Sequence, residues 1–215
     1  MSEIEIVKPS EIEKRSFEII GVELKKMGIE LPKAQEKIIK RAIHTTADFD
    51  YATTLKFSEN AVEIAEEIIK NGCYIVTDTN MALSGINKKV LSDFSGEARC
   101  FMADEGVAAE AKERGVTRAT VSMERASKLD RPVIYAIGNA PTALISLKEL
   151  MDKGCTTPAF IIGVPVGFVN VVAAKELFLG GDVPYIINEG RKGGSNVAAA
   201  ICNALLYDLR EKSVL

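Results

Sequence analysis

The chain has 215 residues, 47% of them apolar and 27% charged, and its formal net charge at pH 7 is −3. A chain of this length can bury a large core, so we expect one domain over 1–215 that needs no disulfide or metal to fold. The small acidic excess gives no reason to expect nucleic acid or an anionic membrane as a partner.

The cysteines and the N-terminal sequence favour a cytoplasmic protein. The four cysteines are far apart and form no C-x-x-C pair, so zinc and iron–sulfur spacing is absent and we expect buried, reduced thiols. The beginning, MSEIEIVKPSEIEKRSF, is charged throughout and does not resemble a signal peptide. No run approaches the roughly 20 apolar residues of a membrane-spanning helix. We therefore expect a soluble chain without a bound metal.

The N-terminal third of the sequence predicts three helices. Ser10 and Glu13 have the spacing of a capping box at the start of the first helix. Pro32 suits the first position of a second helix, which would carry His44 near its C-terminal end. A third helix fits residues 59–71. The first helix would bury one apolar stripe, made of Ile12, Ile19, Ile20, Leu24 and Met27.

After these helices, short apolar runs alternate with helical patterns. The predicted strands are 73–78, 99–102, 132–138, 158–163 and 184–188. The predicted helices are 105–114, 118–130, 141–153, 169–179 and about 195–211. Unbroken apolar strands separated by helices favour a largely parallel sheet that is covered on both faces. We therefore predict a three-layer α/β/α fold with about five strands, preceded by N-terminal helices.

The turns that follow the predicted strands are the candidate ligand sites, because ligands of parallel sheets bind beyond the carboxyl ends of the strands. These turns are TDTNMALSG, GNAPTAL with Asn139, GVPVGFV and NEGRKGGSN. Each carries Gly, Asn, Asp or Pro, where main-chain amides can approach a ligand closely. Such turns also occur in α/β proteins of many functions, so they indicate a place and not a ligand.

His44 is the only histidine in the chain, and it is the candidate acid or base. Histidine suits proton transfer near neutrality because its ordinary pKa is about 6.5. Arg41 lies one turn before His44 and Thr45 follows it. A histidine at a helix C-terminus is also favoured by the helix dipole alone, and spacing by itself favours that structural interpretation.

The segment GRKGGSN is a candidate anion site. Arg191 and Lys192 precede Gly193, Gly194 and Ser195, and a predicted helix follows. Cations, a glycine turn and a helix N-terminus each attract an anion. A loop in which Ser195 or Asn196 caps the helix explains the segment equally well. It is not a Walker A motif because its lysine precedes the glycines, but it leaves open an enzyme acting on phosphorylated metabolites.

Together and in this order, the segments resemble the precorrin-8X methylmutase family. The resemblance runs from KPSEIEKRSFEII through RAIHTTADFDYA, TDTNMALSGI, AIGNAPTAL and IIGVPVGFVN to PYIINEGRKGGSNVAAAICNAL. It implies an isomerase of corrin (vitamin B12) biosynthesis that moves a methyl group from carbon eleven to carbon twelve of precorrin-8 or cobalt-precorrin-8. The product would be hydrogenobyrinate or cobyrinate. Such a shift needs no redox cofactor, nucleotide or methyl donor, so we expect no cofactor.

The resemblance also implies residue roles. It makes His44 the general acid/base and places Ser16, Arg41 and, on less distinctive flanking sequence, Arg118 in contact with the substrate. Arginines would bind the acetate and propionate arms of the macrocycle. For the glycine-rich turns it implies only proximity to the ligand. It further implies a homodimer with sites near the subunit boundary, and the alternative function is a non-catalytic corrinoid carrier.

Overall fold

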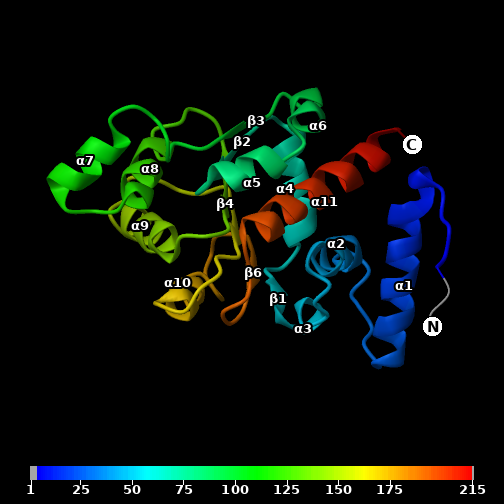
Figure 1. Ribbon diagram of the computed structural model, residues 1–215. Helices are drawn as coiled ribbons and strands as arrows, with labels where there is room; N and C mark the ends of the chain where they lie inside the picture. The colour runs from blue at the N-terminus through cyan, green and yellow to red at the C-terminus, as the bar shows by residue number, and fades with distance from the viewer. Residues whose placement is uncertain (1–3, 215) are drawn as a thin grey trace.

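The computed structural model describes residues 4–214 and places a six-stranded sheet between two layers of helices (Figure 1). The strands are β1 Leu55–Phe57, β2 Tyr74–Thr77, β3 Glu97–Arg99, β4 Val133–Ile137, β5 Phe160–Gly163 and β6 Tyr185–Asn188. Their order in the sheet is β1-β6-β5-β4-β2-β3, and all pairs are parallel except β1 with β6. The predicted three-layer α/β/α fold with a largely parallel sheet is confirmed.

The two helical layers differ in content (Figure 1). The first layer consists of α2 Glu36–Thr46, α3 Tyr51–Thr54, α4 Ala61–Lys70, α5 Asn80–Gly85, α6 Lys88–Asp93 and α11 Ser195–Val214, with α1 Ile12–Lys26 packed outside α2. The second layer consists of α7 Val107–Arg114, α8 Arg118–Ala126, α9 Pro141–Asp152 and α10 Val171–Glu176. The central helix of the first layer is α11, which contacts α2, α4, α5 and α6.

The central strands are apolar throughout because each of their faces packs against one of the helical layers. In β4, Ile134 and Ala136 belong to the core beneath α11 and α2, whereas Tyr135 and Ile137 belong to the core beneath α8 and α9. Alternate residues of a strand point to opposite faces, so a strand between two helical layers has no polar face. This explains why the apolar runs of the sequence predicted the strands well.

The departures from the predicted elements concern short segments. Strand β1, an antiparallel edge strand of three residues, and α3, α5 and α6, of four to six residues, were not predicted. Segments this short do not complete the periods on which the prediction depends. Helix α5 occupies what was expected to be an open turn, because the Thr79 hydroxyl accepts the Ala82 N–H at 3.1 Å and caps it. Strand β3 begins two residues earlier than expected.

The predicted N-terminal details were partly wrong. Ser10 lies in a 3-10 turn (Pro9–Glu11) and caps no amide of α1, so the capping box does not form. Pro32 precedes α2 and accepts the Gln35 N–H in a turn at 2.9 Å. The apolar stripe of α1 buries Ile20 and Leu24 only, because α1 packs on α2 along a narrow contact. The remaining members of the stripe, Ile12, Ile19 and Met27, are exposed.

The expectation of buried thiols is correct for two of the four cysteines. Cys73 and Cys202 are buried, Cys100 is half-buried and Cys155 is exposed, and all four are free. None of the helices within residues 4–214 is both long enough and apolar enough to cross a membrane.

Gly138, the first residue after β4, allows the main chains of two distant segments to meet. A β-carbon at this position would lie 2.7 Å from Ser195 Cα and 2.8 Å from Gly194 O. We predict that Gly138→Ala lowers the free energy of unfolding by about 1–3 kcal/mol, because main-chain atoms cannot move aside cheaply. Urea denaturation measures this. The control Gly181→Ala, whose β-carbon meets nothing closer than 3.5 Å, should stay within about 0.5 kcal/mol of the parent; equal losses would contradict the prediction.

Candidate active site

The turns after the parallel strands are tied to one another by a buried carboxylate. Asp78 follows β2, and its two oxygens accept the main-chain N–H groups of Gly138, Asn139 and Ala140 at 2.9, 2.8 and 2.5 Å. Asp78 is fully buried, and burial raises its pKa, while the three N–H donors act in the opposite direction. The Asp78 carboxylate therefore fixes the main chain of the turn after β4.

The same edge of the sheet receives the glycine turn that follows β6. The hydroxyl oxygens of Thr79 and Ser195 are 2.7 Å apart, and Gly194 N–H donates to Val164 O at 2.9 Å. A β-carbon on Gly193 would lie 2.0 Å from Val164 O, so only glycine permits this approach. The four strand-end turns thus meet at the N-terminus of α11, as the parallel topology predicted.

Helix α2 delivers His44 in its last turn. Ile38, Ile39, Ala42 and Ile43 are buried against α11 and the sheet, which leaves the opposite side of the helix to polar side chains. The His44 imidazole is exposed, and its ring meets that of Phe17 edge to face at a centroid distance of 5.6 Å. The helix ends at Thr46, and the residue that follows it, Ala47, adopts the left-handed conformation with φ 54°.

Arg41, one turn before His44, is held in a fixed orientation by α1 and α11. Its guanidinium donates to both carboxylate oxygens of Glu13 at 2.7 and 2.9 Å. It also lies over the rings of Phe17 and Tyr207, at 4.8 and 5.6 Å from their centroids. The hydrogen bond from Arg41 lowers the pKa of Glu13. Arg41 therefore already binds a carboxylate with the paired geometry that the sequence predicted for a ligand arm.

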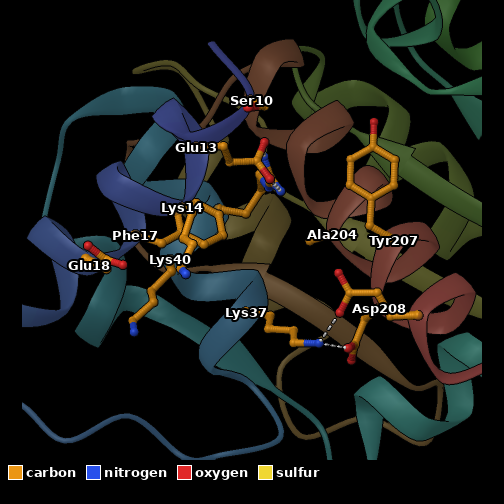
Figure 2. A pocket seen from close by; sticks show the side chains of 12 residues that line it. Ser10, Glu13, Lys14, Phe17, Glu18, Lys37, Lys40, Ala204, Tyr207 and Asp208 are labelled. Carbon is orange, nitrogen blue, oxygen red and sulfur yellow. Dashed lines mark hydrogen bonds and ion pairs between the residues drawn. The ribbon is translucent and has the colours of Figure 1, made fainter. Parts of the chain in front are cut away.

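Two hollows flank the Arg41–Glu13 pair. One, of about 420 Å³, lies between α2, α5 and α11, and Thr45, Met81 and Asn196 are among its walls. The other, of about 460 Å³, lies between α1, α2 and α11, where Figure 2 shows Glu13 and Phe17 opposite Tyr207. Since Glu13, Arg41 and Tyr207 line both hollows, the ion pair stands at their common border.

The Lys192 side chain joins the glycine turn to the loop that follows His44. Its ammonium donates to Asp48 Oδ2 and Asp50 Oδ2, both at 2.6 Å. These hydrogen bonds lower the pKa of Asp48 and raise that of Lys192. The neighbouring guanidinium of Arg191 lies over the exposed ring of Phe168 at 5.7 Å. The two cations of the turn thus point to different partners.

The remaining predicted site residues lie at different distances from this group. Ser16 is next to Phe17 on α1, and its hydroxyl donates to Ile12 O at 2.9 Å. Asn139 is exposed beyond β4, with its main-chain N–H bound to Asp78. Arg118 is an exposed residue at the start of α8, in the helical layer opposite α2. The structure therefore places Arg41 and Thr45 in one hollow with Asn196 of the α11 N-terminus, places His44 beside Phe17 outside the walls of both hollows, and places Arg118 across the sheet.

Comparisons with known proteins assign the chain to a family. A family model described as precorrin-8X methylmutase matches residues 11–208. A cobalt-precorrin-8 methylmutase of Salmonella typhimurium is 44% identical over 210 residues, which cover 96% of this chain and 98% of that protein. A solved precorrin-8x methyl mutase from Thermus thermophilus matches with a TM-score of 0.85 at 37% identity, over 94% of this chain and 96% of the other. The chain belongs to the precorrin-8X methylmutase family.

Membership in the precorrin-8X methylmutase family confirms the resemblance carried by the ordered motifs, and with it the expectation of an isomerase. A precorrin-8X methylmutase of Pseudomonas aeruginosa is also similar, at 37% identity over 90% of this chain and 93% of that protein.

Several residues of the site were not predicted from the sequence. The role of Asp78 could have been predicted, because an aspartate directly after a buried strand is placed to bind main-chain N–H groups of the neighbouring turns. Glu13 was predicted as a cap, so its partnership with Arg41 was missed. Phe17 and Tyr207 carried no local signal, because each reaches Arg41 only through the packing of α1 and α11 around α2.

Asp78 offers a direct test of how the site is held together. We predict that Asp78→Asn lowers the free energy of unfolding by about 1–3 kcal/mol, because the amide provides one acceptor oxygen and sets an NH₂ group against an N–H donor. Chemical denaturation measures the loss, and amide hydrogen exchange should quicken at Asn139 and Ala140. The exposed residue Asp182 supplies the control, Asp182→Asn, which should leave both quantities unchanged. Parent-like stability of Asp78→Asn would contradict the assignment.

Proposed function

We propose that this chain moves a methyl group from carbon eleven to carbon twelve of precorrin-8 or cobalt-precorrin-8, giving hydrogenobyrinate or cobyrinate, with His44 as the general acid/base. The observation that carries the proposal is the exposed imidazole of His44, which lies one helical turn from Arg41 and next to Thr45, two residues that line the hollow of about 420 Å³ beside the α11 N-terminus. Imidazole and guanidinium side by side suit a substrate that must be both protonated and held by carboxylates.

His44 acts by lending a proton. The imidazolium donates it to a ring nitrogen or an adjacent carbon, which makes the conjugated system more electron-poor as the methyl migrates. The bond from carbon eleven to the methyl breaks, the bond to carbon twelve forms, and the proton returns to His44, so the composition does not change. The edge contact with Phe17 limits rotation of the imidazole, which supports a defined direction for the transfer.

The arms of the macrocycle are bound by cations and amides from both helical layers in this proposal. Arg41 binds one arm by exchanging the Glu13 carboxylate for that of the substrate, and the exposed Arg191 and Arg118 bind others. Lys192 adds positive charge to the turn while its ammonium stays on Asp48 and Asp50. The remaining proposed contacts are the polar groups of Ser16, Thr45, Asn139 and Ser195 and the main-chain amides of Gly193 and Gly194.

A homodimer completes the site in this proposal. Large apolar side chains are exposed on α5, which follows β2, and on the turn after β5: Met81 is 71% exposed, Phe168 85% and Val169 79%. Large exposed apolar side chains often mark interaction surfaces of proteins. A second copy of the chain would cover these residues and close the crevice over the macrocycle.

Replacement of His44 tests the proposed acid. We predict that His44→Asn lowers turnover of precorrin-8 by about 10²–10⁴-fold, because general acid catalysis contributes roughly that factor. Substrate binding, followed by titration of the chromophore, should change little. Arg15→Ala is the control that should retain full turnover, because Arg15 pairs with Glu5 on the outer side of α1. Full activity of His44→Asn would refute the assigned role.

Sedimentation velocity tests the proposed dimer. We predict a species of twice the chain mass. The double variant Phe168→Ser, Val169→Ser should shift towards the monomer, because it removes the two most exposed of the three apolar side chains of the proposed interface. Its turnover should fall together with the dimer fraction. A fully active monomer would overturn the proposal.

A further inference from the structure

We infer that Lys175 is a positioning residue, which fixes the main chain on both sides of Arg191 so that this arginine meets a substrate carboxylate. The inference rests on the proposed function, because it concerns the same ligand turn. Lys175 lies on α10 in the second helical layer, behind the turn that follows β6. None of the sequence motifs pointed to it.

Lys175 is a buried cation with main-chain partners. Its side chain is 1% exposed, and its ammonium donates to Gly190 O and to Lys192 O, both at 2.8 Å. Burial lowers the pKa of Lys175 to about 8. A buried ammonium is costly unless hydrogen bonds satisfy it, and an apolar side chain of similar length would avoid that cost. We therefore assign these two hydrogen bonds the role of holding the turn.

The two carbonyl groups belong to the residues that bracket Arg191. Asn188 adds to this arrangement, because its side-chain amide donates to Lys192 O at 2.9 Å. Gly190 adopts the left-handed conformation with φ 75°, and Arg191 O accepts the Gly167 N–H at 3.2 Å. The main chain around Arg191 is thus fixed from three directions, and Lys175 binds it on either side. The guanidinium over Phe168 takes its direction from this fixed main chain.

The same hydrogen bonds act on the His44 side of the crevice. Lys192 O is bound by Lys175, and the Lys192 ammonium is bound by Asp48 and Asp50 in the loop after α2. The position of the turn relative to the His44 loop therefore depends on an amine in the opposite helical layer. When that amine is removed, Gly190 O and Lys192 O lose a charged donor and the turn opens.

Steady-state kinetics with precorrin-8 test the inference. Lys175→Met should raise KM at least tenfold and leave kcat within twofold, because binding of the arms is weakened while the acid stays in place. Lys175→Gln, which keeps an NH₂ donor, should raise KM less, and it provides the test if Lys175→Met does not fold. Lys56→Met is the matched control: it removes a cation that pairs with Glu189 of the same segment at 3.3 Å, and KM should not change. An unchanged KM in both Lys175 variants would overturn the inference.

A double-mutant cycle and amide exchange separate positioning from general stability. If Lys175 acts through Arg191, Lys175→Met on an Arg191→Ala background should raise KM no further, whereas independent, additive increases would contradict the inference. Exchange at Gly167 and Gly194 should quicken in Lys175→Met at unchanged global stability, and parent-like exchange would also contradict it. Failure of the parent chain to convert precorrin-8 refutes the proposed function instead, and exchange still reports on the turn.

Discussion

The site depends on how the polar main chain is satisfied where four strands end at one edge of the sheet. Two buried charges solve this problem in opposite ways. Asp78 accepts three N–H groups of the turn after β4, and Lys175 donates to two carbonyl groups of the turn after β6. Each charge would be costly alone, and each is stabilised by main-chain groups of the turn that it binds. These hydrogen bonds fix the main-chain conformation of both turns, and polar main-chain groups of the turns that they leave free can still be directed towards a ligand.

Helix α11 forms one wall of the crevice beside these turns. Its N-terminus meets the turns and its length contacts α2, so Arg41 and Thr45 of α2 and Asn196 of α11 line one hollow. Two of these main-chain contacts require glycine: Gly138 lies against Gly194 and Ser195, and Gly193 lies against Val164. Since Lys192 bridges to Asp48 and Asp50 in the loop after α2, hydrogen bonds connect the glycine turn to the loop that follows His44. In the proposed function, this connection places the acid and the cations on one surface.

The sequence predicted most of the sheet, since strands buried on both faces are long apolar runs such as that of β4. It predicted His44 at the end of α2 and the convergence of the strand-end turns. It could not predict the pairs that depend on packing between distant elements. Glu13 met Arg41 instead of an N-terminal amide, and Lys175 lay in a helix without any motif. Exposed Ile19 and Met27 carried the same local pattern as buried Leu24, because periodicity does not reveal how wide a helix contact is.

The central claim is that the crevice beside His44 converts a bound macrocycle by an internal methyl shift. Precorrin-8 with a carbon-13 label on the migrating methyl group tests it most directly, by NMR under single-turnover conditions with excess protein. The proposal predicts that the label leaves the chemical shift of a substituent on carbon eleven and appears at that of a substituent on carbon twelve, without loss to solvent. A label that remains on carbon eleven while the macrocycle is fully bound would contradict the claim and support a corrinoid carrier.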